Sequence, residues 1–433
     1  MAGAGDHGRW PLVSDHVDVD LWDPATFAAA MPDEAFGLLR GDAPVAWHNE
    51  RPRREGGHAG PGFWCITTHA DIQTVSMQPD VFSSWLGGFT GADTGGVVLD
   101  ETRLNLMGMD PPDHTAFRAS IRAPFGPRVT RDLGAVIEGY AEAIVDEVAP
   151  LGEVDFVESI ASELPLLTLS HLLGVDESDR RLFYDWSNRI IGNHDPEFGG
   201  SVRDFLTAKD ELFAYGRQVI AEKRARPDHG LVSTFIASEV DGVPLDDEKI
   251  ILLWFLLLIA GNETTRSSLT GAMEMLAAHP DQRAWLVDDL DNRLPGFIEE
   301  SLRCTNPVLH FRRTATRDVE LNGARIREGD KVILWYPSAN RDEAVFDDPF
   351  TFDPTRSPNH HVAFGFGPHF CLGARIGRLQ IEVMLRELLT RLPDIEVVVP
   401  AQRAHSTFLN SPKSLGVLFT PEGRSPVRED QRS

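Results

Sequence analysis

The longest uninterrupted apolar run in the chain covers residues 250–260, which is eleven residues. It lies inside a longer pattern that predicts one helix from Asp246 to His279. The acidic residues at its start suit the positive end of a helix dipole, and Pro280 ends the pattern. A membrane span needs about 20 apolar residues, and this segment is apolar on nearly every side at its centre. The pattern therefore predicts a helix that crosses a protein core.

A second helical pattern follows residue 371 and ends before Pro393. Its apolar side chains recur at three- and four-residue spacing, which is typical of a helix with one buried face. The positions are Leu372, Ile376, Leu379 and Val383.

Strand signals are few and short. Residues 62–67 form an apolar stretch after a Pro/Gly-rich loop, and residues 319–336 predict a hairpin. The turn of that hairpin is Asn322-Gly323, the strongest short hairpin signal. Helical patterns occupy most of the remaining chain, so we expect a mainly α fold with small β-sheets.

No linker, internal repeat or low-complexity segment divides the 433 residues. We expect one domain over residues 1–433, with an N-terminal extension over residues 1–40 and a polar C-terminal tail over residues 421–433. Irregular polar segments at 83–105 and 192–201 are the predicted mobile loops.

Charge and cysteine content narrow the possible functions. Lys and Arg number 41 against 66 Asp and Glu, a net charge of −25, which argues against binding to nucleic acid or to anionic membranes. Three cysteines, Cys65, Cys304 and Cys371, give no disulfide framework and fit a reducing compartment. The N-terminus has no signal-peptide pattern, so we expect a cytoplasmic protein without a membrane anchor.

The segment around Cys371 is the strongest candidate for chemistry. Gly365 and Gly367 suggest a dinucleotide-binding loop, but Phe370 occupies the third glycine position and no parallel-sheet unit surrounds it. The sequence also lacks the Walker A, H-E-x-x-H, C-x-x-C and G-x-S-x-G patterns.

A lone cysteine is most often a buried thiol without chemistry, and that interpretation stays open for Cys371. Its predicted place at a helix start, however, favours a thiolate with a lowered pKa, which is a ligand for a soft metal. Zinc needs more ligands than one, and His360, His361 and His369 lie too close together in the same loop to complete a tetrahedral site with Cys371. Haem iron needs one axial ligand from the protein.

Residues 364–373 read Phe-Gly-Phe-Gly-Pro-His-Phe-Cys-Leu-Gly. They match the pattern F-G-x-G-x-H-x-C-x-G at every fixed position and so resemble the haem-binding loop of the cytochrome P450 family. The resemblance covers about residues 45–420. It implies a single-domain cytochrome P450 fold enclosing haem b (iron protoporphyrin IX), with Cys371 as the metal ligand. Phe364, Gly365 and Gly373 would belong to the loop that holds the cofactor.

Residues 260–265, Ala-Gly-Asn-Glu-Thr-Thr, are similar to the oxygen-binding stretch of that family. The resemblance implies that Thr264 hydrogen-bonds dioxygen, that Glu263 delivers protons through water, and that Ala260 and Gly261 lie against the cofactor. The alternative interpretation is that the helix merely tolerates Gly261 and that the Thr264 hydroxyl forms a hydrogen bond with the backbone of its own helix. Against it, a mid-helix glycine costs about 1 kcal/mol and a buried carboxylate costs more.

Two further sets of residues follow from the same resemblance. Glu300, Arg303 and Arg356 would form a structural clamp for the haem loop. Four residues would bind the two haem propionates, a role in which Arg312 could replace its neighbour Arg313. They are His114, Arg118, Arg313 and His369.

The resemblance implies a soluble bacterial-type monooxygenase that hydroxylates a hydrophobic small molecule, such as a steroid, a terpenoid or a lipid-like compound. It would use O2 and two electrons from a ferredoxin and its ferredoxin reductase. The distal pocket would be lined by Ile259, Ala260, 308–311 and 407–409. A basic patch for the ferredoxin would comprise Arg118, Arg122, Arg128, Arg375 and Arg378.

Two alternatives remain. The first is a natural-product tailoring oxidase acting on an aromatic or polyketide-like substrate. The second is a non-catalytic haem-binding sensor or carrier, against which Glu263 with Thr264 argues, because a carrier has no use for a proton relay.

Overall fold

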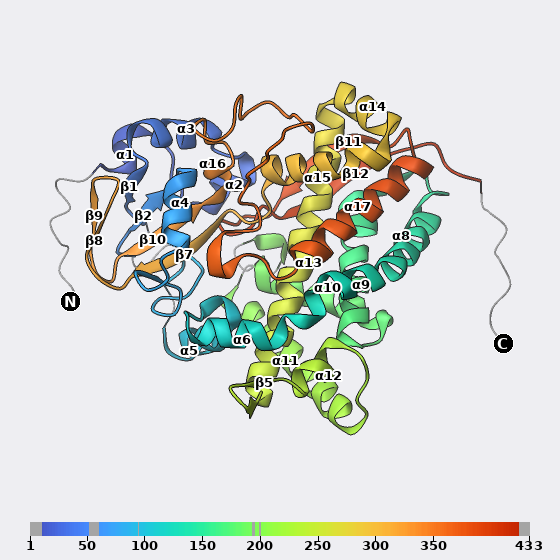
Figure 1. The fold of residues 1–433 in the computed structure, drawn as a ribbon. Helices are drawn as coiled ribbons and strands as arrows, with labels where there is room; N and C mark the ends of the chain where they lie inside the picture. Colours follow the sequence, from blue (N-terminus) through green and yellow to red (C-terminus); the bar gives the residue numbers. More distant parts are fainter. Residues whose placement is uncertain (1–10, 52–59, 94, 193–194, 199–200, 424–433) are drawn as a thin grey trace.

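The structure is a computed structural model that describes residues 11–51, 60–93, 95–192, 195–198 and 201–423. A large helical part lies beside a smaller part that is built around a β-sheet, and α13 runs through the middle of the helical part (Figure 1). The predicted mainly α fold with small β-sheets is confirmed.

The described α-helices are α1 (Val13–His16), α2 (Pro24–Ala29), α3 (Asp33–Asp42), α4 (His69–Ser76), α5 (Gly96–Leu104), α6 (Asp113–Ile121), α7 (Pro127–Asp132), α8 (Gly134–Val148), α9 (Glu163–Leu173), α10 (Arg180–Ile191), α11 (Val202–Ala225), α12 (Leu231–Ile236), α13 (Asp247–Ala278), α14 (Pro280–Asp288), α15 (Leu290–Thr305), α16 (Tyr336–Ala339) and α17 (Ala374–Arg391). The described strands are β1 (Val45–His48), β2 (Phe63–Ile66), β3 (Phe82–Ser83), β4 (Glu153–Asp155), β5 (Glu239–Val240), β6 (Val243–Pro244), β7 (His310–Ala315), β8 (Val319–Leu321), β9 (Ala324–Ile326), β10 (Lys331–Trp335), β11 (Glu396–Arg403) and β12 (Pro412–Leu418).

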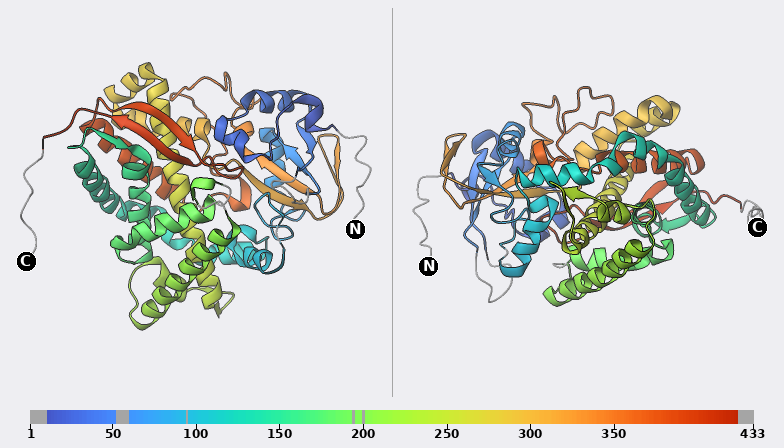
Figure 2. Two further views of the ribbon diagram at one scale, coloured as in Figure 1. Left: turned by 180° about the vertical axis from the view of Figure 1, so that it is seen from behind. Right: turned by 60° about the horizontal axis from the view of Figure 1, so that its bottom comes forward.

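Helix α13 matches the prediction from the apolar run. Asp246 caps it by accepting a hydrogen bond from the Lys249 N–H at 2.8 Å, and it ends at Ala278. By length and composition α13 could cross a membrane, but more than half of its apolar stretch is buried inside this protein. It packs against α9, α11, α15 and α17. Figure 2 shows the helical part that contains α13 from two further sides. It is therefore a core helix.

The main sheet has the strand order β1-β2-β10-β7-β3, and the predicted strand at 62–67 is its β2. The predicted Asn322-Gly323 turn is also confirmed, because both residues have positive φ, at 47° and 78°, between β8 and β9. The predicted hairpin is too long, however. Every residue of β10 is buried between β2 and β7 in the main sheet, so the hairpin ends at Ile326.

The predicted mobile loops need partial correction. Within 83–105, residues 96–104 form α5, and residues 89–93 are hydrogen-bonded to the main sheet. Residues 193–194 and 199–200 of the second loop lie outside the described residues, as do 1–10 of the predicted extension and 424–433 of the predicted tail.

Candidate active site

The loop before α17 is held by its own backbone. The Cys371 N–H donates to the Phe364 carbonyl at 2.9 Å, and the Phe370 N–H donates to the Gly367 carbonyl at 3.0 Å. Gly365 and Gly367 have φ of 73° and 72°, which L side chains adopt only with strain. A Cβ on Gly367 would also lie 2.7 Å from the Ser76 carbonyl oxygen. The two glycines are required for the loop to turn and to approach α4.

Cys371 precedes the helix and does not lie in its first turn. Gly373 is the N-cap of α17. Burial raises the pKa of the Cys371 thiol, while a hydrogen bond from the Gly373 N–H and the charges of Arg118 and Arg378 act in the opposite direction. The predicted lowering of this pKa by the helix start is therefore wrong for the chain by itself, because burial outweighs the helix and the nearby cations.

Cys371 lies deep in the protein and is nevertheless exposed. Ala260, in the middle of the core helix α13, is also exposed. A residue that is both deep and exposed borders an internal space. The site therefore offers a thiol ligand and room beside it.

Four basic groups gather beside the Cys371 loop, as the resemblance implies. The His114 and His369 rings lie 4.2 Å apart between centroids, and Arg118 donates to the Phe370 carbonyl at 2.6 Å. Arg313 is buried and donates to the Arg312 carbonyl at 2.7 Å. His114 is 1% exposed, and neither of its ring nitrogens has a hydrogen-bond partner.

The charge of this cluster is not compensated. Burial, and then the charge of Arg118, lowers the pKa of His114 to about 4. Burial, and then Arg313, holds the pKa of His369 well below its usual range. Within the part of the chain that the structure describes, no carboxylate forms an ion pair with any of the four groups. Asp110, whose charge acts on His114 and Arg313 at longer range, accepts hydrogen bonds from Ser83 and Ser84.

This donor set fits haem. The four basic groups match a ligand that carries two carboxylates, and the orphaned nitrogens of His114 need a hydrogen-bond partner. The Cys371 sulfur is a soft ligand of the kind that binds haem iron. The residues present could thus hold both the propionate edge and the iron.

The choice between Arg312 and Arg313 is decided by their partners. Arg312 donates to the Asp93 carboxylate at 2.8 Å and to the Ala92 carbonyl at 3.1 Å. The positive charge of Arg312 is therefore compensated by Asp93. Arg313 is the one whose charge acts on both His114 and His369.

On α13, the Thr264 hydroxyl donates to the Ala260 carbonyl at 2.7 Å. A Cβ on Gly261 would lie 3.1 Å from the Leu169 side chain in α9, so Gly261 allows the two helices to pack closely. Helix α13 is continuous through this point. Gly261 is therefore explained by the close packing of α13 on α9. Ala260 and Thr264 border the internal space beside Cys371.

Glu263 is fully buried and paired. Arg266, one turn further along α13, donates to Glu263 Oε2, and the Ser411 hydroxyl donates to the same oxygen at 2.8 Å. Arg266 also donates to Asn188 Oδ1 at 2.9 Å, and Glu263 Oε1 has no partner. Sequence analysis missed Arg266, although its i+3 spacing from the carboxylate was available as a signal.

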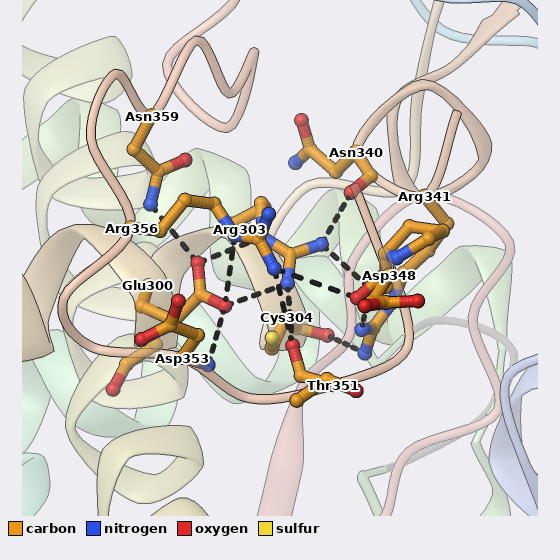
Figure 3. Close-up of polar contacts among 12 residues, drawn as sticks. Glu300, Arg303, Cys304, Asn340, Arg341, Asp348, Thr351, Asp353, Arg356 and Asn359 are labelled. Atoms are coloured by element: carbon orange, nitrogen blue, oxygen red, sulfur yellow. Dashed lines mark hydrogen bonds and ion pairs between the residues drawn. The ribbon is translucent and has the colours of Figure 1, made fainter. Parts of the chain in front are cut away.

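The predicted clamp is confirmed (Figure 3). Glu300 and Arg303 form two parallel hydrogen bonds of 2.8 and 2.7 Å, and Arg356 Nε lies 3.3 Å from Glu300 Oε1. Arg303 also donates to the carbonyls of Asn340 and Pro349, both at 2.8 Å. These buried contacts fix three segments to α15, so the trio is structural.

The clamp has a further member that the sequence analysis did not identify. Asn359 Nδ2 donates to Glu300 Oε2 at 3.0 Å and connects the clamp to the segment that leads to Cys371.

The predicted basic patch is smaller than expected. Arg378 forms two hydrogen bonds with Glu299, at 2.6 and 2.8 Å, and Arg118 is directed to the loop carbonyl. Arg122, Arg128 and Arg375 are exposed.

Comparisons with known proteins identify the family of the chain. Residues 182–422 match the family model "Cytochrome P450". The chain is 37% identical over 412 residues to a steroid C26-monooxygenase of Mycobacterium tuberculosis, covering 94% of both proteins. It is 36% identical over 415 residues to linalool 8-monooxygenase of Pseudomonas putida, covering 93% of this chain and 99% of the relative.

A solved structure is similar along the same length. A cytochrome P450 of Mycobacterium marinum in complex with pseudoionone superposes with a TM-score of 0.86 at 36% identity, covering 93% of this chain and 99% of that one. The two relatives and this structure each cover more than nine tenths of the chain. The chain belongs to the cytochrome P450 family and is a monooxygenase of that family.

Proposed function

We propose that this protein is a haem-thiolate monooxygenase that hydroxylates a hydrophobic small molecule of the steroid, terpenoid or lipid type. The observation that carries the proposal is the uncompensated cluster of His114, Arg118, Arg313 and His369 next to Cys371. Such a cluster costs stability unless an anionic ligand occupies it.

Cys371 would be the axial ligand of haem b, and the four basic groups would bind its propionates. Haem, when bound, supplies the activation of dioxygen. The chain holds the ligand loop rigid through the Glu300 clamp, and the Gly373 N–H is directed at the Cys371 sulfur. The apolar residues of α13 keep bulk water out of the site.

Thr264 and Glu263 would manage protons. The Thr264 hydroxyl donates to the Ala260 carbonyl, which leaves its oxygen able to accept a hydrogen bond from water or a reactant. Glu263 is one residue away, and its Oε1 is unpartnered. For Glu263 to pass a proton to the Thr264 side, its carboxylate must turn away from Arg266 and Ser411.

The substrate class is supported by the side chains around the predicted pocket. Phe89, Phe311 and Phe408 come from three separate segments, and their ring centroids lie 5.6 to 6.5 Å apart. Aromatic walls of this kind favour apolar molecules. The curated relatives act on a steroid and on linalool, and the solved neighbour holds pseudoionone, so a steroid, terpenoid or lipid substrate is the proposal.

The electrons would come from a ferredoxin with its reductase, in the cytoplasm. With a net charge of −25, the protein needs a local basic surface to attract an acidic donor. Exposed Arg122, Arg128 and Arg375 would supply it.

The absorption spectrum of the reduced, carbon-monoxide-bound protein tests the ligand assignment. We expect the shifted Soret band of thiolate-ligated haem, whereas an unshifted band would contradict it. The low-spin to high-spin shift then tests the substrate class, with linalool, pseudoionone and a steroid bearing a C26 side-chain carbon as probes.

A further inference from the structure

His310 is the first residue of β7, and its ring connects two loops that are far apart in the sequence. Nδ1 lies 2.7 Å from the Thr407 carbonyl oxygen, and Nε2 lies 3.2 Å from the Gly91 backbone nitrogen. The side chain is 1% exposed and packs edge-on against Trp335 and Phe408. It contributes to neither the cysteine loop nor the basic cluster.

The two partners fix the protonation of the ring. A carbonyl oxygen such as that of Thr407 can only accept a hydrogen bond, and the Gly91 N–H can only donate one. His310 therefore carries its proton on Nδ1, and its unprotonated Nε2 accepts the hydrogen bond from Gly91. The neutral His310 ring thus forms hydrogen bonds with both loops at the same time.

Each of the two loops carries an aromatic side chain that packs against Phe311, a residue of the predicted pocket. Phe89 lies two residues before Gly91, and Phe408 directly follows Thr407. Both rings contact Phe311, the residue after His310, at centroid distances of 6.2 and 5.6 Å. The relative position of Phe89 and Phe408 thus depends on the same stretch of β7.

The contact at Gly91 leaves little freedom. A Cβ on Gly91 would lie 2.4 Å from the Trp22 ring and 2.9 Å from His310 Nε2, so the backbone passes as close as it can. Lys331 donates to the Gly91 carbonyl at 3.2 Å, and Lys331 and Arg312 each donate to Asp93 at 2.8 Å. These bonds anchor the 89–93 segment to the sheet, and His310 also ties it to Thr407.

We propose that His310 is a positioning residue for substrate orientation. By holding the 89–93 segment against the 404–411 loop, it sets the shape of the wall made by Phe89, Phe311 and Phe408. That shape decides which carbon of a bound molecule faces the reacting centre. The inference rests on the proposed function, because it assumes an apolar substrate in this pocket.

Two substitutions separate positioning from packing. His310→Phe keeps the ring volume and its contacts with Trp335 and Phe408 but removes both hydrogen bonds. His310→Gln keeps one donor and one acceptor in the same side chain. With linalool and pseudoionone as probes, we expect His310→Phe to raise the dissociation constant about ten-fold, the effect of losing buried hydrogen bonds. We also expect it to change the ratio of hydroxylated products, and His310→Gln to restore both quantities in large part.

His48→Phe is the matched control. His48 is another buried histidine of the same sheet, and its Nε2 accepts a hydrogen bond from the Leu21 N–H at 3.1 Å in the N-terminal segment. His48→Phe should lower the free energy of unfolding about as much as His310→Phe does, but it should leave the ratio of hydroxylated products unchanged. An unchanged dissociation constant and product ratio in His310→Phe, or an equal change in His48→Phe, would overturn the inference.

The two proposals fail in different ways. If the wild-type protein shows no spin-state shift with linalool, pseudoionone or the steroid, the proposed substrate class is wrong. The role of His310 is then measured by amide hydrogen exchange in the haem-loaded protein. Exchange at Gly91 should be faster in His310→Phe than in the wild type and slow again in His310→Gln. Equal exchange in all three proteins would contradict the link between the loops.

Discussion

Arg303 and Arg313 are both buried, ten residues apart in the sequence, and their surroundings are electrically opposite. Burial lowers the pKa of Arg303, but the hydrogen bonds and charge of Glu300 outweigh it, so the pKa is raised overall. Burial also lowers the pKa of Arg313, and there the weaker effects of Tyr336 and Asp110 leave it lowered. The chain neutralises the first charge by itself and leaves the second without a counter-charge.

The difference separates structure from function. A buried cation with a carboxylate partner is part of the folding unit, because breaking the pair leaves a charge in a medium that solvates it poorly. A buried cation without a partner destabilises the chain until an anion binds. The Glu300 clamp belongs to the first kind, and the cluster of His114, Arg118, Arg313 and His369 belongs to the second.

The largest expected effect is at the clamp. Arg303→Ala leaves Glu300 buried without its main partner, so we expect a loss of about 3–5 kcal/mol in the free energy of unfolding and little folded, haem-loaded protein. Denaturant unfolding and haem content measure this. Arg293→Ala, on the same helix as Arg303, removes a partly exposed ion pair with Asp288 of α14 and the contacts of Arg293 with Trp285, and it should cost much less, about 1 kcal/mol. Similar losses in both variants would refute the assigned role.

The next effect concerns pH. The folded pKa of His114 is about 4 against an ordinary value of 6.5, so the unfolded chain binds the proton first as the pH falls. The titration of His114 should therefore cost the haem-free protein about 3 kcal/mol between pH 7 and pH 4, in addition to the contribution of His369, and little of the His114 loss arises above pH 6.5.

Urea unfolding of the haem-free protein across this pH range provides the measurement, with His114→Phe as the control that lacks the loss. Haem propionates would raise the pKa of His114, so the haem-loaded protein should show a smaller loss. An equal loss with and without haem would contradict the assignment of His114 to the propionates.

Arg313→Ala should have opposite effects on the stability of the haem-free and the haem-loaded protein. Without haem, the variant removes an unpaired buried cation, so stability should rise or stay unchanged. With haem, it removes a charged hydrogen-bond donor, and we expect haem binding to weaken by about 1–3 kcal/mol. Haem transfer to an acceptor protein and unfolding of both forms measure the two values. Destabilisation of both forms would place Arg313 with Arg303 as a structural residue.

The smallest effect on stability is expected at exposed cations, because water solvates them. Reversing Arg122 and Arg375 to Glu should change stability by less than about 1 kcal/mol. The same change should slow reduction by an acidic ferredoxin several-fold at low salt and weaken its salt dependence. Stopped-flow reduction checks this against the control of reversing Arg224 and Arg226, at and just after the C-terminal end of α11. Equal rates in the two double variants would argue against the patch.

Local patterns predicted the core helix and located the candidate site. The apolar run gave α13 to within a residue at each end, and the ten-residue motif identified Cys371 and its loop. The predicted hairpin was too long because β10 is an apolar strand close after β9 in the sequence, although its partners β2 and β7 come from distant segments. Pairing with distant strands leaves no local signature.

The sequence by itself determined the family, the candidate cysteine ligand and the residue types of the clamp, because each is encoded in a short run with fixed spacing. Tertiary structure decided which charges are paired. Glu263 is paired with Arg266 and accepts a hydrogen bond from Ser411, and Arg312 is paired with Asp93. Arg313 has a carbonyl partner but no counter-charge, and the His114 ring has no hydrogen-bond partner. It also decided that His310 joins Gly91 to Thr407. Charge balance and loop position depend on distances between segments that folding brings together, and spacing along the chain does not contain those distances.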